Sequence, residues 1–485
     1  MHKNIKKLGS QTAIYGLGGM LTQAISFFLL PLYTKYLSTS DYGSLELINT
    51  FFRVANQFFM LGLGTAMYRS FFKAESDAEK KSIVTSTAYF LFIYTFILTL
   101  PFYFMPDNIS RICFGENAGP LWAKFVGLTI FLNSLFQLPL RVLRAEQRAL
   151  RYLVIDVTIF LVTLALNIIF IARLNLGVLG FVEGRCIGTF MGLLISISII
   201  FKYLSSKPSL REIKKQLKYG IPLVMANLAI FVIVSSDRYF IKAFAGMENL
   251  GIFSVSYKFA SIFTFLILTP FSIAWGPFMF SLAREKNAQE NFAVITQVFL
   301  IIACLFFLGI SIFSKEIMLF MVDKKFMPAL KFIPLITAGL ITEGFSHICS
   351  IGLHLKGKSN YLATINWITA LICLVANYFF IRIWGMFGAA YSILLVRVIL
   401  ISMQFFISQR LYPIKYNYAK MIKILIFCGL IFFFCRYLNS TSLFLSLISK
   451  ASIFLLFPIS LFVFKLIRFT DIKKMLLKSK IEGRV

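Results

Sequence analysis

The stretch Leu45-Glu46-Leu47-Ile48-Asn49-Thr50-Phe51-Phe52-Arg53-Val54-Ala55-Asn56 places charged and amide side chains inside a long apolar segment. Glu46, Asn49, Arg53 and Asn56 recur at steps of three and four residues, so they share one face of a helix. A charge at the centre of a bilayer costs roughly 3 kcal/mol unless it faces water or another charge. The stretch therefore predicts a transmembrane helix with a polar stripe toward a cavity. The alternative is a Glu46–Arg53 pair that only fixes helix packing.

The same pattern of charge within apolar sequence recurs along the chain. The other residues that show it are Lys124, Asp156, Glu183, Arg185, Asp237, Arg238, Lys258, Glu343, His347 and Arg397. Repeated charges at membrane depth predict a polar, mostly cationic interior, because each must face water or a partner. Such an interior suits transport of something large or anionic.

The composition supports a membrane protein. Of the 485 residues, 59% are hydrophobic and 14% are charged, whereas about 25% are charged in soluble domains. Apolar windows of about 20 residues, the length that spans a bilayer, occur about 14 times. Their limits are 10–34, 43–72, 83–105, 118–141, 152–173, 177–201, 219–242, 250–281, 291–313, 327–354, 360–381, 386–409, 419–437 and 443–466. We therefore predict an all-α polytopic membrane protein with about 14 transmembrane helices.

The formal net charge of +29 could indicate nucleic-acid binding, but its distribution indicates topology instead. About 30 cationic residues fall in alternate loops on one side and about 10 on the other, as the positive-inside rule describes. This predicts a multi-pass protein of the cytoplasmic membrane with both termini in the cytoplasm and no nucleic-acid partner. The seven cysteines and three histidines show no ligand spacing, so we expect no metal and no cofactor.

The two halves of the chain resemble each other. Asp41-Tyr42-Gly43 corresponds to Asn249-Leu250-Gly251, and Asn167 corresponds to Asn377, at an offset of about 205–210 residues. Basic residues precede the first and seventh helices alike, so the repeat is predicted to be parallel, with substrate between the halves. The predicted units are an N-terminal lobe (1–203, helices 1–6), an amphipathic cytoplasmic linker (204–218), a C-terminal lobe (219–410, helices 7–12), two appended helices (411–467) and a basic cytoplasmic tail (468–485).

The seventh and eighth predicted helices carry one group of candidates. Asp237 and Arg238 are adjacent, and adjacent residues point apart on a helix, so we expect no direct pair between them. Lys258 is the expected partner of Asp237. A structural bridge between the two helices and direct contact with substrate both fit this arrangement.

The tenth and twelfth predicted helices carry the other group. Glu343 and His347 lie four residues apart on one face, and a carboxylate–imidazole pair at mid-membrane can titrate near neutral pH. Proton coupling is one hypothesis and a quiet hydrogen-bonded pair is the other. Arg397 lies at mid-membrane with no acid nearby in its own helix.

Several motifs, taken in order, resemble a known family. They are the run 31–43, Gly62-Leu63-Gly64-Thr65-Ala66, Ser236-Asp237-Arg238, the run 251–258, Trp275-Gly276-Pro277-Phe278, and Asn377 with Gly385 and Gly388. Together they are similar to bacterial polysaccharide-repeat-unit flippases, the Wzx-like branch of the multidrug/oligosaccharidyl-lipid/polysaccharide exporter superfamily. The resemblance covers essentially the whole chain.

The resemblance implies two six-helix lobes, alternating access, and flipping of undecaprenyl-pyrophosphate-linked oligosaccharide repeat units for O-antigen, capsule or exopolysaccharide. The expected partners are this lipid-linked substrate, membrane lipids, a polysaccharide polymerase and chain-length proteins. Arginine forks suit phosphate oxygens. The candidates for substrate binding are Arg53, Arg238, Lys258, Arg397, Asn49 and Asn56, and those for ion coupling are Glu343, His347 and Asp237.

Two alternative functions fit a polytopic membrane protein less well. A multidrug exporter of the same superfamily would favour acidic cavity residues. A membrane glycosyltransferase or polysaccharide polymerase would need a sizeable outer loop for catalytic residues, whereas the largest outer loop here, near 105–119, is short. We therefore expect a transporter rather than an enzyme.

Overall fold

The computed structural model describes residues 23–204, 207–436 and 443–464, and within these ranges it contains helices and no strand. Eleven of the described helices are long and apolar enough to cross a membrane. The chain is therefore a multi-span, all-helical membrane protein, as predicted. The number of about 14 spans stays a prediction, because the first expected span, 10–34, lies partly outside the described residues.

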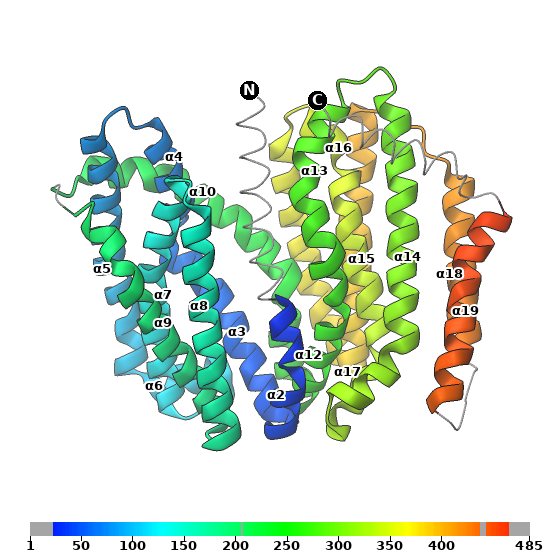
Figure 1. The fold of residues 1–485 in the computed structure, drawn as a ribbon, viewed down its shortest axis with the longest axis horizontal. Coiled ribbons are helices and arrows are strands. Elements are labelled where there is room, and N and C mark those ends of the chain that lie inside the picture. The colour runs from blue at the N-terminus through cyan, green and yellow to red at the C-terminus, as the bar shows by residue number, and fades with distance from the viewer. Residues whose placement is uncertain (1–22, 205–206, 437–442, 465–485) are drawn as a thin grey trace.

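The first half of the chain forms one bundle of helices, on the left of Figure 1. A short helix, α2 (Leu30–Tyr36), precedes it. The helices that follow are α3 (Thr39–Met60), α4 (Leu63–Lys73), α5 (Asp77–Phe104), α6 (Pro106–Phe114), α7 (Pro120–Ala145), α8 (Ala149–Ile168), the π-helix η1 (Ile169–Arg173) and α9 (Gly177–Phe201). The predicted block 43–72 is thus two helices, because Leu61 and Gly62 adopt left-handed backbone conformations between α3 and α4. We call this bundle the N-lobe.

The second half forms another bundle, the C-lobe, with two further helices at its edge (Figure 1). Its elements are α10 (Leu210–Ser235), α11 (Asp237–Ala245), α12 (Met247–Ala260), η2 (Thr264–Leu268), α13 (Thr269–Leu282), α14 (Ala288–Met321), η3 (Lys324–Lys331), α15 (Ile333–Cys349), α16 (Ile351–Leu355) and α17 (Ser359–Leu411), followed by α18 (Tyr418–Arg436) and α19 (Leu443–Val463). α10 begins inside the predicted linker and continues without interruption into the bundle.

The 53-residue α17 is interrupted where the sequence predicts the connection between two spans. A straight helix of that length would measure about 80 Å, more than twice the hydrocarbon thickness of a bilayer. Gly385 has a φ of 56° and a ψ of −130°, a backbone conformation that favours glycine. This residue separates the predicted spans 360–381 and 386–409.

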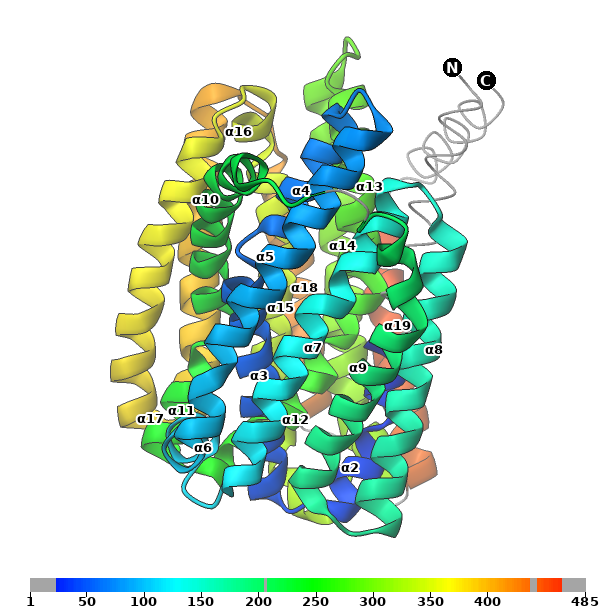
Figure 2. The same ribbon diagram turned by 90° about the vertical axis from the view of Figure 1, so that its left-hand side faces the viewer.

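The lobes meet along α3 and α12, whose backbones approach closely. A Cβ atom on Gly43 would overlap the carbonyl of Met247, and one on Gly251 would overlap the carbonyl of Thr39. Gly43 and Gly251 are the positions that the internal repeat makes equivalent. Their mutual contact is therefore what a parallel pseudo-repeat requires at its axis. In Figure 1 the two lobes diverge from this junction, and Figure 2 shows the N-lobe from its outer side.

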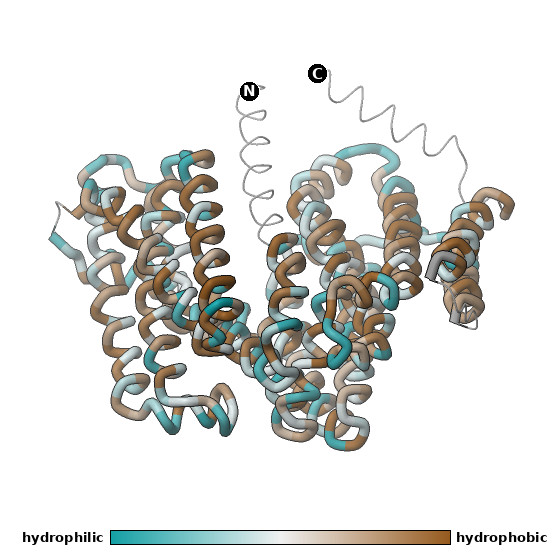
Figure 3. Tube along the Cα trace, turned by 60° about the horizontal axis from the view of Figure 1, so that its bottom comes forward, coloured by the Kyte–Doolittle hydropathy of each residue, from teal (hydrophilic) through white to brown (hydrophobic). Residues whose placement is uncertain are grey.

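Many large hydrophobic side chains are exposed at the surface of the bundle. Hydrophobic residues cover most of each helix in Figure 3, and the hydrophilic segments lie mainly at helix ends and in loops. At the edge of the C-lobe, a buried ion pair joins α14 to α19, with Lys450 Nζ 2.6 Å from Glu316 Oε1. This pair attaches the last helix to the bundle at membrane depth.

Candidate functional site

The polar stripe of α3 lies at the junction of the lobes, and Glu46 is its centre. Glu46 Oε1 lies 3.5 Å from Arg53 Nη2 on the same helix and 3.6 Å from Arg238 Nε on α11. The first contact is the ion pair that the sequence left as an alternative. The second contact joins the N-lobe to the C-lobe, which the sequence analysis did not foresee. Glu46 therefore links the two lobes electrostatically.

Arg238 pairs directly with its neighbour, so the expectation that Asp237 and Arg238 would not pair was wrong. Arg238 Nη1 lies 2.7 Å from Asp237 Oδ1 and donates to the Val234 carbonyl at the same distance. Both residues lie in the first turn of α11, and Ser236 before them keeps right-handed helical dihedrals. The long Arg238 side chain reaches back over the preceding turn, where one nitrogen meets both the Asp237 carboxylate and the Val234 carbonyl. The guanidinium also lies over the Tyr257 ring, 4.2 Å from its centroid.

Lys258 has a different partner from the one predicted. Its ammonium donates to the Ser26 hydroxyl at 2.9 Å instead of bridging to Asp237. Ser26 belongs to the first helical segment of the described chain, residues 23–28, so this contact also joins the two halves. Lys258 is within electrostatic reach of Glu46 and Arg53. It therefore belongs to the same charged cluster.

Arg397 and Glu343 form a second ion pair within the C-lobe. Arg397 Nη1 lies 2.5 Å from Glu343 Oε2, and the arginine side chain is only 4% exposed, against 37% for the glutamate. The predicted Glu343–His347 pair is replaced here by a pair between α15 and α17. The backbone carbonyl of His347 accepts a hydrogen bond from the Trp275 indole at 3.0 Å. Asp237 is within electrostatic reach of Arg397, which connects this pair to the lobe junction.

Arg185 of α9 is a member of the cluster that was not among the predicted site residues. Its Nη1 donates to Asn49 Oδ1 at 2.9 Å, and its guanidinium lies 4.0 Å from the centroid of the Phe52 ring. The signal that could have revealed it was present, since Arg185 is an arginine inside an apolar span. Asn56, also on the predicted stripe, accepts a hydrogen bond from Asn133 of α7 at 3.2 Å.

The cluster as a whole carries more positive than negative charge. Its cations are Arg53, Arg185, Arg238, Lys258 and Arg397, and its acids are Glu46, Asp237 and Glu343, which leaves two positive charges in excess. Arg53 is the most accessible of the paired arginines, with 51% of its side chain exposed. An uncompensated positive charge at membrane depth is costly, and an anion bound here would lower that cost.

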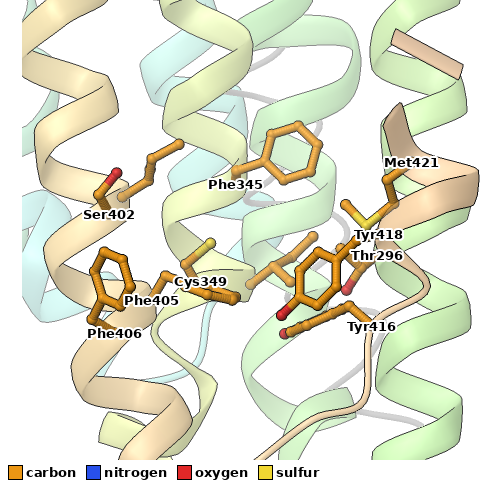
Figure 4. A pocket seen from close by; sticks show the side chains of 11 residues that line it. Thr296, Phe345, Cys349, Ser402, Phe405, Phe406, Tyr416, Tyr418 and Met421 are labelled. Atoms are coloured by element: carbon orange, nitrogen blue, oxygen red, sulfur yellow. The ribbon is translucent and has the colours of Figure 1, made fainter. Parts of the chain in front are cut away.

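A separate cavity of about 270 Å³ lies at the edge of the C-lobe, among α14, α15, α17 and the segment that leads into α18 (Figure 4). Aromatic side chains dominate its lining, among them Phe345, Phe405 and Tyr416. None of the charged cluster residues lines it. The cavity therefore has apolar chemistry distinct from that of the lobe junction.

Solved structures of membrane transport proteins share this fold. The fold matches a solved structure of the lipid II flippase MurJ in an inward closed conformation, with a TM-score of 0.75 and 15% identity over 94% of this chain and 100% of that chain. It also matches an inward-facing multidrug resistance MATE family transporter of the MOP superfamily, with a TM-score of 0.62 and 13% identity over 83% and 96% of the two chains.

A third solved structure is a MOP superfamily transporter from Pyrococcus furiosus that is described as having a binding pocket of reversed polarity. It matches with a TM-score of 0.55 and 15% identity over 82% of this chain and 95% of that chain. At these identities the likeness shows the fold. No curated protein sequence matches the chain significantly.

The sequence assigns the family. Residues 8–283, more than half of the chain, match the family described as polysaccharide biosynthesis protein, and the chain belongs to that family.

Proposed function

We propose that the protein flips undecaprenyl-pyrophosphate-linked oligosaccharide repeat units across the bacterial cytoplasmic membrane by alternating access, for the synthesis of a cell-surface polysaccharide. The observation that carries the proposal is the excess of cations over acids at the lobe junction. A diphosphate attached to a lipid is an anion at membrane depth, and arginine forks bind phosphate oxygens in bidentate fashion. The family and the flippase-like fold support the same substrate class.

The roles within the cluster follow from exposure and pairing. Arg53 is half exposed, so its guanidinium can exchange Glu46 for a phosphate at little cost in desolvation. Arg185 lies within electrostatic reach of Arg53 and carries no ion pair with an acid in the described part of the chain. These two arginines, with Lys258, form the predicted binding surface for the diphosphate. Asn49 and Asn56 position the N-lobe side of that surface through their hydrogen bonds.

A multidrug exporter is the competing function within the same fold. Cationic, lipophilic drugs require acidic partners, whereas each acid of the cluster already faces an arginine. A net positive cluster repels such substrates. The charge balance therefore favours an anionic substrate.

Coupling to a proton gradient is a second part of the proposal, and it centres on Glu343. Glu343 is the most exposed acid of the cluster and holds the buried Arg397. Protonation of Glu343 would release Arg397 from its ion pair, while His347, one turn further along α15, supplies a second titratable group. Asp237 is the alternative counterion for Arg397. Transport in inverted vesicles with an imposed pH gradient tests this role, and full gradient dependence in Glu343→Gln would remove it.

The test of the main proposal is complementation in a strain that lacks this protein and its surface polysaccharide. We expect Arg53→Ala and Arg397→Ala to abolish the surface glycan while the protein stays in the membrane at normal levels. Arg53→Lys should restore the glycan only in part, because an ammonium cannot make a bidentate phosphate contact. Normal glycan in both alanine variants at matched expression would exclude the proposed role of the cluster.

A further inference from the structure

One arginine outside the lobe junction has no partner, although it is largely buried. Arg141 lies one turn before the end of α7, and its Nε atom is buried without a hydrogen bond. Within the described residues, the structure records neither an ion pair nor a hydrogen bond for any atom of this side chain. The charged group that acts on it most strongly is another cation, Arg144.

The position of Arg141 is built into the packing of the N-lobe. Its guanidinium lies directly against Gly64 of α4, and a Cβ atom at Gly64 would overlap Cζ, Nε and Nη1. The central Cζ atom is the nearest of the three, so the flat face of the guanidinium lies against α4. Only a residue without a side chain leaves room for this arrangement.

The acids nearby are already engaged with other cations. Glu146 pairs with Arg148 at 3.0 Å and with Lys202 at 3.9 Å, and it accepts a hydrogen bond from the Tyr203 hydroxyl at 2.5 Å. Asp156 interacts electrostatically with Arg144. The Arg144 guanidinium also lies over the Tyr152 ring and donates to the Tyr152 hydroxyl. Arg141 is thus a largely buried cation at this end of the N-lobe for which the described chain supplies no anion.

An unpaired, desolvated arginine costs several kcal/mol, and removal of that cost requires an anion. Arg141 is four residues from the end of α7, or about 6 Å along the helix axis. This end of the bundle carries the basic loops that the positive-inside rule assigns to the cytoplasm. At that depth the anions of a membrane are lipid phosphates.

We propose that Arg141 is a phosphate-binding residue at the cytoplasmic end of the N-lobe, which receives the diphosphate of the lipid-linked substrate before the substrate reaches the lobe junction. The inference rests on the proposed function. Packing against Gly64 fixes the plane of the guanidinium, and its Nη1–Nη2 edge is the fork that binds phosphate oxygens. The positive charge of Arg144 adds long-range attraction without taking part in the contact.

The experiment measures the affinity of the purified full-length protein in detergent for farnesyl diphosphate, a short-chain prenyl diphosphate. We expect Arg141→Gln to weaken binding by about tenfold or more, since hydrogen bonds to charged groups contribute about 1.5–3 kcal/mol. Arg144→Gln removes the same charge three residues away and is the matched control, with an expected loss of less than about threefold. Arg141→Lys keeps the charge without the fork, and an intermediate affinity is expected, which separates phosphate binding from a folding defect.

Four results would overturn the inference. Equal losses in Arg141→Gln and Arg144→Gln would show a general effect of charge. An unchanged affinity in Arg141→Gln, with a loss in Arg53→Gln, would overturn this site and leave the proposed function intact, whereas a wild-type protein that does not bind the probe would count against both. If Arg141→Gln lost only co-purified phosphatidylglycerol, seen by native mass spectrometry, the ligand would be a phospholipid headgroup rather than the substrate.

Discussion

Replacement of Glu46 by glutamine should shift the protein toward a state in which the lobes part at their present junction. Glu46 lies on α3 of the N-lobe, and its partner Arg238 lies on α11 of the C-lobe, 3.6 Å away. This pair exists only while the two helices are in contact. The glutamine keeps the shape of the side chain and removes the attraction, so the variant weakens one state selectively.

The size of the effect can be worked from the contacts. Two unit charges 3.6 Å apart attract by about 5 kcal/mol at an effective dielectric constant of 20. Arg238 retains Asp237 at 2.7 Å, so much of its compensation survives. The pair with Arg53 lies within α3 and is present in both states, so it does not change their ratio. We expect a net loss of about 2 kcal/mol, which changes the ratio of the two states by about 30-fold.

The measurement is a spin-label distance across the lobes. Exposed positions for the labels are Glu116 in the N-lobe and Lys324 in the C-lobe, each changed to cysteine, with the half-buried Cys113 replaced by serine. Double electron–electron resonance should show a short-distance population in the parent and a dominant longer distance in Glu46→Gln.

The matched control is Glu316→Gln. Glu316 is also a buried glutamate in an ion pair, but it joins α14 to α19 rather than lobe to lobe. This variant should lower thermal stability and leave the distance distribution unchanged. An unchanged distribution in Glu46→Gln, or an equal shift in both variants, would refute the assignment of Glu46 as the bridge between the lobes.

Three further predictions concern stability. Gly251→Ala should lower the unfolding temperature and destabilise the fold by about 1–3 kcal/mol, because the added methyl group meets the Thr39 carbonyl. A thermal shift assay measures this, and the control is Gly276→Ala, at a glycine with open space around its Cβ position. Lys450→Met should lower the free energy of unfolding by about 3–5 kcal/mol, because it leaves Glu316 buried and without its ion pair. The double variant with Glu316→Leu should recover most of that stability. A double variant no more stable than Lys450→Met would contradict this. Burial and the hydrogen bond to Glu146 raise the pKa of Tyr203 above 10.0 in the folded protein. The tyrosine therefore ionises at lower pH in the unfolded chain, and stability should fall as pH rises above about 10. Unfolding midpoints measured between pH 8 and 11 should show a smaller fall in Tyr203→Phe.

The helices could be predicted because their signal is local. A run of about 20 apolar residues is sufficient to mark a span. The limits 177–201 agree with α9, and 118–141 overlap most of α7 (Pro120–Ala145). The interruptions were harder to predict. The break at Leu61 and Gly62 and the one at Ser236 depend on what each helix packs against.

The charged residues were found by sequence, whereas most of their partners, other than Arg53 for Glu46, were not. Depth in an apolar segment is a property of the sequence, and it identified Arg53, Arg238, Lys258 and Arg397. Pairing is a property of the packing, because Glu343 and Arg397 are 54 residues apart and Arg185 and Asn49 are 136 apart. Reasoning along one helix favoured the i,i+4 neighbour His347 for Glu343, and the structure supplied Arg397 from another helix.

The pairing changes how the cluster can work. If the arginines faced an open cavity without partners, substrate would bind without affecting the lobes. Glu46 instead pairs with both Arg53 and Arg238, so a diphosphate that binds Arg53 must compete with the carboxylate that joins the lobes. Substrate binding would then weaken the junction by up to the same 2 kcal/mol or so that Glu46→Gln removes. The variant tests this as well, because without the competing carboxylate it should bind farnesyl diphosphate more tightly than the parent, and a weaker affinity would show that Glu46 positions the arginines instead of competing for them.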